Sequence, residues 1–111
     1  MLSFQKLRVY QRSIAFLALT VELLETLPKG HADLADQILR AAQSIPRNIA
    51  EGAGRRTSVD QARFYVMARG SAMECAATLD TMRIMKLLAG ERYDAGIDHL
   101  EAVVAMLTKM C

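Results

Sequence analysis

Tryptophan is absent from this chain of 111 residues, and aromatic side chains make up only 5% of it. Two prolines and six glycines are the only strong helix breakers. An all-β chain would carry turn signals about every 8 to 12 residues, so this scarcity excludes that class. Apolar residues make up 52% of the chain and include seven methionines. We therefore expect one all-α domain, residues 1–111, with an aliphatic core.

Long apolar runs and cysteine clusters are also missing. No stretch approaches the roughly 18 apolar residues of a membrane span, and the first residues lack the apolar block of a signal peptide. We therefore expect a cytoplasmic protein without membrane contact. Cys75 and Cys111 have neither the spacing of metal ligands nor the density of a disulfide scaffold, so both are expected to be reduced thiols.

No group of residues has the pattern of a catalytic site. His31 and His99 belong to no metal-binding motif and are expected to be solvated. Gly52 and Gly54 follow a helical pattern rather than a strand, and no phosphate-binding lysine comes after them. No histidine is placed to activate a serine, and Cys75 fits a core position. We expect no catalytic residue, no metal and no cofactor, and the protein is not expected to be an enzyme.

The net charge of +2 is unevenly distributed. Residues 1–30 and residues 61–90 each carry four basic against two acidic side chains, whereas residues 91–111 carry two against four. Solvated helix faces explain this pattern in the simplest way, and a surface that binds a polyanion is the alternative.

Apolar residues recur at spacings of three and four, which predicts amphipathic helices. The first helix is expected over residues 4–27 and ends at Pro28. Its apolar stripe is Leu7, Tyr10, Ile14, Leu17, Val21 and Leu24. The second helix is expected over residues 31–53, and Gly52 lies on its packed face. Its stripe is Leu34, Ile38, Ala41, Ile45 and Ile49.

Pro46 interrupts the second helix without changing the phase of its stripe. Proline removes one helical hydrogen bond and clashes with the carbonyl four residues earlier. The unbroken phase favours one helix kinked at Pro46 over a loop at residues 45–47. Asn48 and Glu51 are expected to cap the disturbed hydrogen bonds and to pair with arginine.

The third helix is expected over residues 58–88, opened by a capping box from Ser58 to Gln61 and ended by Gly90. It carries two apolar stripes, of which one should form the core and the other a subunit interface. The first stripe is Val59, Val66, Gly70, Met73, Ala77, Ile84 and Leu88. The second stripe is Phe64, Met67, Cys75, Met82 and Met85. A patch suited to close helix approach consists of Gly70, Ser71, Ala72, Ala76 and Ala77.

A fourth helix is expected over residues 92–109. Short connections make successive helices antiparallel, so the chain should form an up-down-up-down four-helix bundle. The second stripe of the third helix, together with a mean hydropathy of +0.14, predicts a homo-oligomer.

One motif has the proline near its start. It comprises Ser44, Ile45, Pro46, Arg47, Asn48, Ile49, Ala50, Glu51 and Gly52, followed by Gly54, Arg55, Phe64, Gly70, Ser71 and Glu74. With Phe4, Leu7, Val9 and Tyr10, it resembles the four-helix bundle proteins encoded in intervening sequences of bacterial 23S ribosomal RNA genes. The resemblance extends over nearly the whole chain. Two positions depart from it: Arg47 replaces a small residue and Gln61 replaces an aromatic one.

The resemblance carries expectations of its own. It implies no enzymatic activity. The family also resembles an accessory protein of diversity-generating retroelements, which is a pentamer. This second resemblance implies that the present chain forms a pentamer and associates with nucleic acid and with a partner protein such as a reverse transcriptase.

Two classes of function therefore remain open. The first is a nucleic-acid-binding or ribonucleoprotein accessory protein that binds RNA or DNA through repeated arginines. These are Arg8, Arg12, Arg40, Arg47, Arg55, Arg56 and Arg63. The second is a protein-interaction scaffold without a nucleic-acid role. The few aromatic residues argue against sequence-specific reading of single strands.

Overall fold

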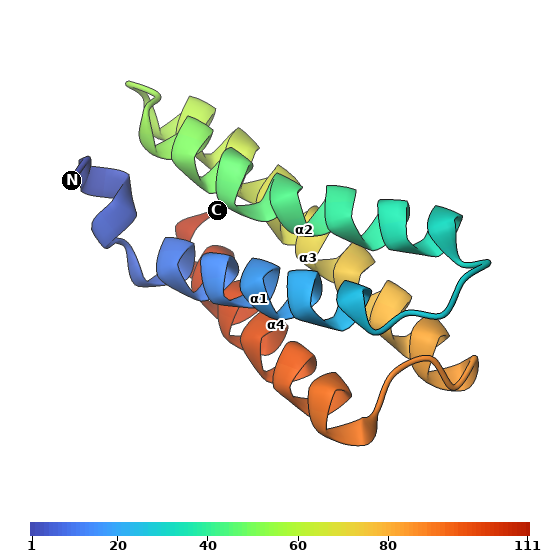
Figure 1. Cartoon of the computed structure of the whole chain (residues 1–111). Coiled ribbons are helices and arrows are strands. Elements are labelled where there is room, and N and C mark those ends of the chain that lie inside the picture. The colour runs from blue at the N-terminus through green and yellow to red at the C-terminus, as the bar shows by residue number, and fades with distance from the viewer.

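The structure is a computed structural model that describes all residues 1–111. It consists of four antiparallel helices. The helices are α1 (Arg8–Glu25), α2 (Ala32–Ala53), α3 (Ser58–Ile84) and α4 (Gly90–Met110). A short 3-10 turn, η1 (Ser3–Lys6), precedes them. Each helix packs on its neighbours in sequence, and α4 closes the bundle against α1. Figure 1 shows α1 and α2 on the near side, with α4 and α3 behind them. The predicted all-α bundle is confirmed.

The helix ends differ from the predicted ones at three places. Leu7 has an extended backbone and separates η1 from α1, so no single helix runs over residues 4–27. Helix α3 ends at Ile84 rather than at residue 88. Gly90, expected to end the third helix, instead begins α4.

A Schellman cap causes the early end of α3. The Leu87 N–H donates to the Met82 carbonyl at 2.9 Å, and the Lys86 N–H donates to the Arg83 carbonyl at 3.0 Å. This geometry requires a left-handed residue, and Lys86 takes that place with a φ of 60°. The cap turns the chain so that Leu88 is buried from the connecting loop.

Helix α2 passes through Pro46 without interruption, as predicted. Its predicted stripe is largely correct, because Ile38, Ile45 and Ile49 are fully buried. Pro46 is itself buried. The bend of the helix at this residue stays a prediction.

The predicted stripe of α1 is not its core face. The buried line is instead Val9, Phe16 and Leu23, while Ile14 and Val21 of the predicted stripe are exposed. Two buried hydroxyl residues interrupt this line and hide it from a reading of hydropathy. They are Ser13 and Thr20, which donate to the backbone carbonyls of Tyr10 and Phe16. Because both hydroxyls are satisfied within the helix, their burial costs little.

Neither predicted stripe of α3 forms the core as a whole. Cys75 and Met82 are buried, but Met67 and Met85 of the same stripe are exposed, and most of the other stripe faces outward. The inner face is a line of mostly small side chains: Tyr65, Ala68, Ala72, Cys75, Thr78, Leu79 and Met82. Small inner residues let α3 approach its neighbours closely.

Gly52 shows how tight this approach is. A Cβ atom at Gly52 would lie 2.7 Å from Cε1 of the Tyr65 ring. Tyr65 is buried and has little room to move. The same Cβ would lie 3.1 Å from the backbone carbonyl oxygen of Gln61, so the predicted close approach of a second backbone at Gly52 is found.

Replacing Gly52 with alanine should therefore lower the free energy of unfolding by about 1–3 kcal/mol, the usual cost of overpacking. Thermal unfolding followed by circular dichroism measures this change. Gly54→Ala is the matched control, because a Cβ there meets nothing closer than 3.6 Å. Equal melting temperatures for the two variants would contradict this account of the α2–α3 contact.

Candidate nucleic-acid interface

A polar network joins α2 to α3 beside the proline. The Ser44 and Ser71 hydroxyls form a hydrogen bond of 2.9 Å. The Asn48 amide donates to the Ser44 carbonyl and to its hydroxyl, both at 2.9 Å. The carbonyl four residues before Pro46 belongs to Ala42, so Asn48 caps a neighbouring carbonyl rather than the expected one. Three motif residues are thereby tied together across two helices.

A groove of about 550 Å³ lies over this network. Arg40 and Arg47 line it from α2, and Glu74 lines it from α3. Asp33 and Asp36 lie at its other end. The groove thus places two arginines and three carboxylates around the two serines.

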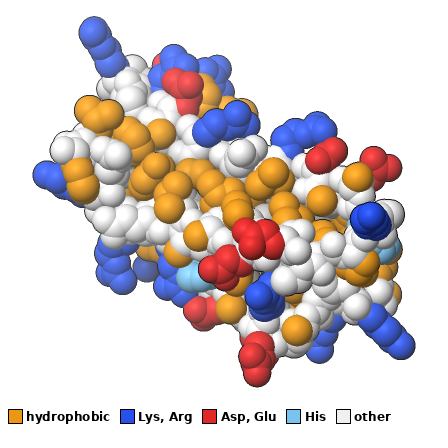
Figure 2. Space-filling view, viewed as in Figure 1, with side chains coloured by type: hydrophobic (Ala, Val, Ile, Leu, Met, Phe, Trp, Pro, Cys, Tyr) orange, Lys and Arg blue, Asp and Glu red, His pale blue; other side chains and the backbone are white.

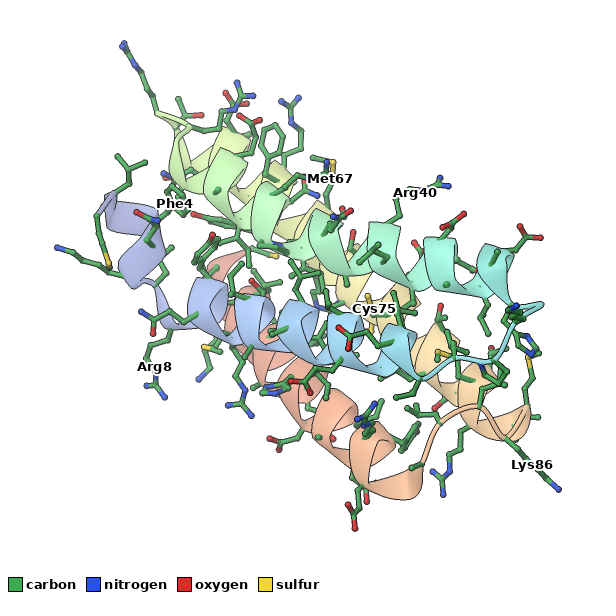
Figure 3. The ribbon with its side chains drawn as sticks, viewed as in Figure 1. Phe4, Arg8, Arg40, Met67, Cys75 and Lys86 are labelled. Atoms are coloured by element: carbon green, nitrogen blue, oxygen red, sulfur yellow. The ribbon has the colours of Figure 1, made fainter.

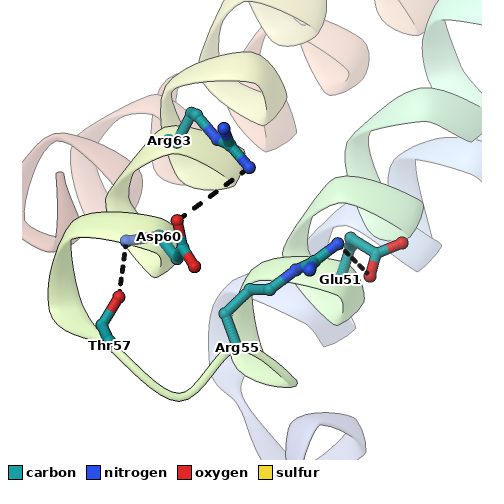
Figure 4. Close-up of polar contacts among 5 residues, drawn as sticks. All are labelled: Glu51, Arg55, Thr57, Asp60 and Arg63. Carbon is teal, nitrogen blue, oxygen red and sulfur yellow. Dashed lines mark hydrogen bonds and ion pairs between the residues drawn. The ribbon is translucent and has the colours of Figure 1, made fainter.

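Further arginines lie in the turn between α2 and α3 and at the start of α3 (Figure 4). Arg55 pairs with Glu51 at 3.2 Å, which confirms the expected pairing of Glu51 with arginine. Arg63 lies 4.0 Å from Asp60. The guanidinium groups of Arg55 and Arg63 both lie over the Phe64 ring, 4.6 and 5.3 Å from its centroid. Cation–π contacts thus hold these two arginines close together beside the connection between α2 and α3.

The helix cap at this turn lies one residue earlier than predicted. The Thr57 side chain accepts a hydrogen bond from the Asp60 N–H at 3.1 Å, so Thr57 rather than Ser58 is the N-cap. The Gln61 side chain donates to the Arg55 carbonyl at 3.0 Å. This bond ties the turn to the first turn of α3.

The seven predicted arginines do not form one surface. Arg8 and Arg12 line a separate hollow between α1 and α4. Figure 3 shows Arg8 and Arg40 pointing away from opposite sides of the bundle. Only Arg40, Arg47, Arg55, Arg56 and Arg63 belong to α2, α3 and their connection.

Arg12 is occupied within the protein. It donates to Nδ1 of His99 at 2.8 Å and forms an ion pair with Asp98. His99 is therefore not solvated as expected. Burial, followed by the nearby Arg12 charge, lowers the pKa of His99. Sequence spacing gives no sign of this cluster, since α1 and α4 are 86 residues apart at this point.

No arrangement suited to catalysis appears among these groups. Burial raises the pKa of the Cys75 thiol to about 12, with a further rise from Glu74. The thiol stays protonated at neutral pH and is a poor nucleophile. The protein contains no group of three His, Cys, Asp or Glu residues able to hold a metal ion. None of the helices is both long enough and apolar enough to cross a membrane.

Comparisons with known proteins agree with this fold. Residues 5–109 match the family model of the 23S rRNA-intervening sequence protein. A crystal structure of a protein of unknown function from the S23 ribosomal protein family of Bacteroides thetaiotaomicron VPI-5482 has a TM-score of 0.84 to this chain. The two are 22% identical, and the match covers 92% of this chain and 96% of the other. No curated protein matches the sequence.

The His99 contact predicts a pH dependence of stability. Because the pKa of His99 is lowered in the folded state, the unfolded chain binds this proton first as pH falls below the ordinary value of about 6.5. The stabilisation is complete above that pH and is lost as pH falls through the lowered pKa. One proton changes stability by at most about 1.4 kcal/mol per pH unit.

Denaturant unfolding between pH 7 and 5 measures this effect. His99→Asn keeps an acceptor for Arg12 but cannot titrate, so its stability should fall less steeply with pH than that of the wild type. His31→Gln is the control and should follow the wild type. Parallel curves for the His99 variant and the wild type would rule out this coupling.

Proposed function

The chain belongs to the 23S rRNA-intervening sequence protein family, and on that premise we propose that it is a non-catalytic, homo-oligomeric accessory protein of the cytoplasm that binds RNA or DNA. The observation that carries the proposal is the state of three arginines. Arg40, Arg47 and Arg56 are exposed, and none has a carboxylate partner within 4.0 Å. Arginines without internal partners are free to bind phosphate.

These arginines are arranged along one side of the bundle. Arg40 and Arg47 are two turns apart on α2, about 10 Å along the helix axis. Arg55, Arg56 and Arg63 continue the series around the connection to α3. Phosphates along a nucleic-acid strand are separated by several ångströms, so such a row supports contacts to the backbone rather than to bases.

Self-association would supply the positive charge that one subunit lacks for binding nucleic acid. A net charge of +2 per chain is small for tight binding. Carboxylates at Asp33, Asp36 and Glu74 also weaken the local field of the groove. An oligomer repeats the arginine row in each copy, and the fields of the copies add. Binding of this kind is tolerant of sequence and sensitive to salt.

A second candidate function is a protein-interaction scaffold. Figure 2 shows a band of apolar side chains across the face made by α1 and α2. Between these helices, Phe4, Tyr10, Ile14, Leu17 and Pro46 line a shallow groove of about 340 Å³. A groove of this chemistry fits an apolar segment of a partner protein.

Gel retardation of RNA and DNA at low salt tests the first function. Replacing Arg40, Arg47 and Arg56 together with glutamine should abolish most retardation. The slope of log affinity against log salt should become shallower by about 2 for a single strand, since each phosphate contact contributes about 0.7. Helicity should not change, because all three side chains lie outside the core.

The matched control is the triple replacement of Lys6, Lys29 and Lys86 with glutamine. It removes the same charge from exposed positions elsewhere. If both triple variants lose binding equally, net charge rather than the arginine row is responsible. Absence of retardation by the wild-type protein at micromolar concentration would leave the scaffold function as the better account.

A further inference from the structure

The groove between α2 and α3 contains a hydroxyl proton for which the protein provides no acceptor. Ser44 and Ser71 share one hydrogen bond of 2.9 Å, so one of their two hydroxyl protons lies between them. The Ser44 hydroxyl oxygen also accepts from the Asn48 amide, and neither hydroxyl donates to any other protein group. Because both serines line the groove, the second proton is available to a ligand.

An unused acceptor lies on the same wall of the groove. Glu74 follows Ser71 by three residues, so the two side chains are neighbours on one face of α3. The Glu74 carboxylate lines the groove and has no basic group within 4.0 Å. The one hydrogen bond at Glu74 is made by its backbone carbonyl, which accepts from the Thr78 hydroxyl. One donor and one acceptor without protein partners are thus presented close together.

This pair of groups complements a hydroxyl group better than a phosphate. A hydroxyl both donates and accepts a hydrogen bond, so it can donate to the Glu74 carboxylate while it accepts the free serine proton. A phosphodiester oxygen can only accept, and the charge of Glu74 repels it. A CH₂ group would leave both protein groups without a partner. The ligand group that fits this point of the groove is therefore a neutral hydroxyl.

Two arginines lie on either side of the same point. Ser44 is four residues after Arg40 and three residues before Arg47, so the three side chains share one face of α2. The two arginines are about 10 Å apart along the helix axis, and both line the groove. A strand whose phosphates contact both arginines consequently passes over Ser44. The sugars between those phosphates are then brought to the serine pair.

We propose that Ser44, Ser71 and Glu74 form a ribose site, which recognises the 2′-hydroxyl group of RNA and thereby selects RNA over DNA. This hydroxyl is the group that distinguishes the two nucleic acids, since DNA carries hydrogen in its place. It donates to the Glu74 carboxylate and accepts the free proton of the serine pair. Recognition of the sugar leaves the bases unread, so binding stays tolerant of sequence.

The ribose site rests on the proposed nucleic-acid binding and narrows it to one class of nucleic acid. The negative charge of Glu74 repels the phosphates of RNA and of DNA alike. Only RNA offers a hydroxyl that turns this carboxylate into a hydrogen-bond partner. Glu74 therefore weakens the binding of DNA without any compensating contact, whereas in the RNA complex the repulsion is offset.

Fluorescence anisotropy with labelled single strands tests the ribose site. Three probes share one sequence of adenine and cytosine bases and carry ribose, deoxyribose or 2′-fluoro-ribose. The 2′-fluoro sugar keeps an RNA-like shape but has no hydroxyl proton to donate. At one low salt concentration the ribose strand should bind roughly ten-fold more tightly than either of the others, the effect of one hydrogen bond to a charged group.

The outcomes separate the ribose site from the proposed function. Equal affinities for the ribose and deoxyribose strands would overturn the ribose site and leave nucleic-acid binding standing. A 2′-fluoro strand bound as tightly as the ribose strand would show recognition of sugar shape, and would also overturn it. Failure of all three probes to bind would remove the proposed function and the ribose site together.

Glu74→Gln separates the hydrogen bond from the charge. Loss of the charge alone should raise the affinities for the ribose and deoxyribose strands by the same factor. Loss of the hydrogen bond to a carboxylate should in addition lower the preference for ribose to about three-fold or less. Asp36→Asn is the matched control, because it removes a groove carboxylate about 12 Å from Ser44 along the axis of α2. Its ribose preference should equal that of the wild type, and an equal preference in Glu74→Gln would contradict the assigned role of Glu74.

Replacing both serines with alanine tests the donor. Either serine alone keeps one free proton, so Ser71→Ala should retain most of the ribose preference and serves as the control. The double variant Ser44→Ala, Ser71→Ala should lower the preference to about three-fold or less. Circular dichroism should show that both variants remain helical, because alanine is a strong helix former. A ten-fold ribose preference in the double variant would exclude the serine pair from the site.

Discussion

The close contact between α2 and α3 is the constraint on which the rest of the structure depends. Gly52 leaves no room for a side chain against Tyr65, and α3 presents Ala68, Ala72 and Cys75 to the core. A tight contact of this kind needs small residues on the inner face. Several larger aliphatic side chains of α3, among them Val59, Val66 and Ile84, are on its outer face, where a single subunit does not bury them.

The same pair of helices organises the polar surface. Ser44, Asn48 and Ser71 connect α2 to α3 just beside the proline. This network fixes the orientation of α2, whose outer side carries Arg40 and Arg47 over the groove. The residues that bring α2 and α3 together therefore also determine which arginine side chains of α2 remain available to other molecules.

The sequence predicted α2 well because its apolar stripe is also its buried face. Prediction failed for α1 and α3 for physical reasons. Ser13 and Thr20 are buried with their hydroxyls bonded to the helix itself, so the core line of α1 does not look apolar. On α3, apolar side chains such as Val59 and Ile84 also lie on the outer face, so the apolar pattern does not single out the buried line. Spacing along the chain also gave no way to separate Arg12, which pairs with Asp98, from arginines that remain free.

The account rests on the claim that the apolar outer faces are covered by further copies of the chain. Light scattering coupled to size exclusion at micromolar concentration measures this most directly. We predict a single species whose mass is that of two or more chains of 12.3 kDa each. A monodisperse species of 12.3 kDa across the same concentration range would contradict the claim.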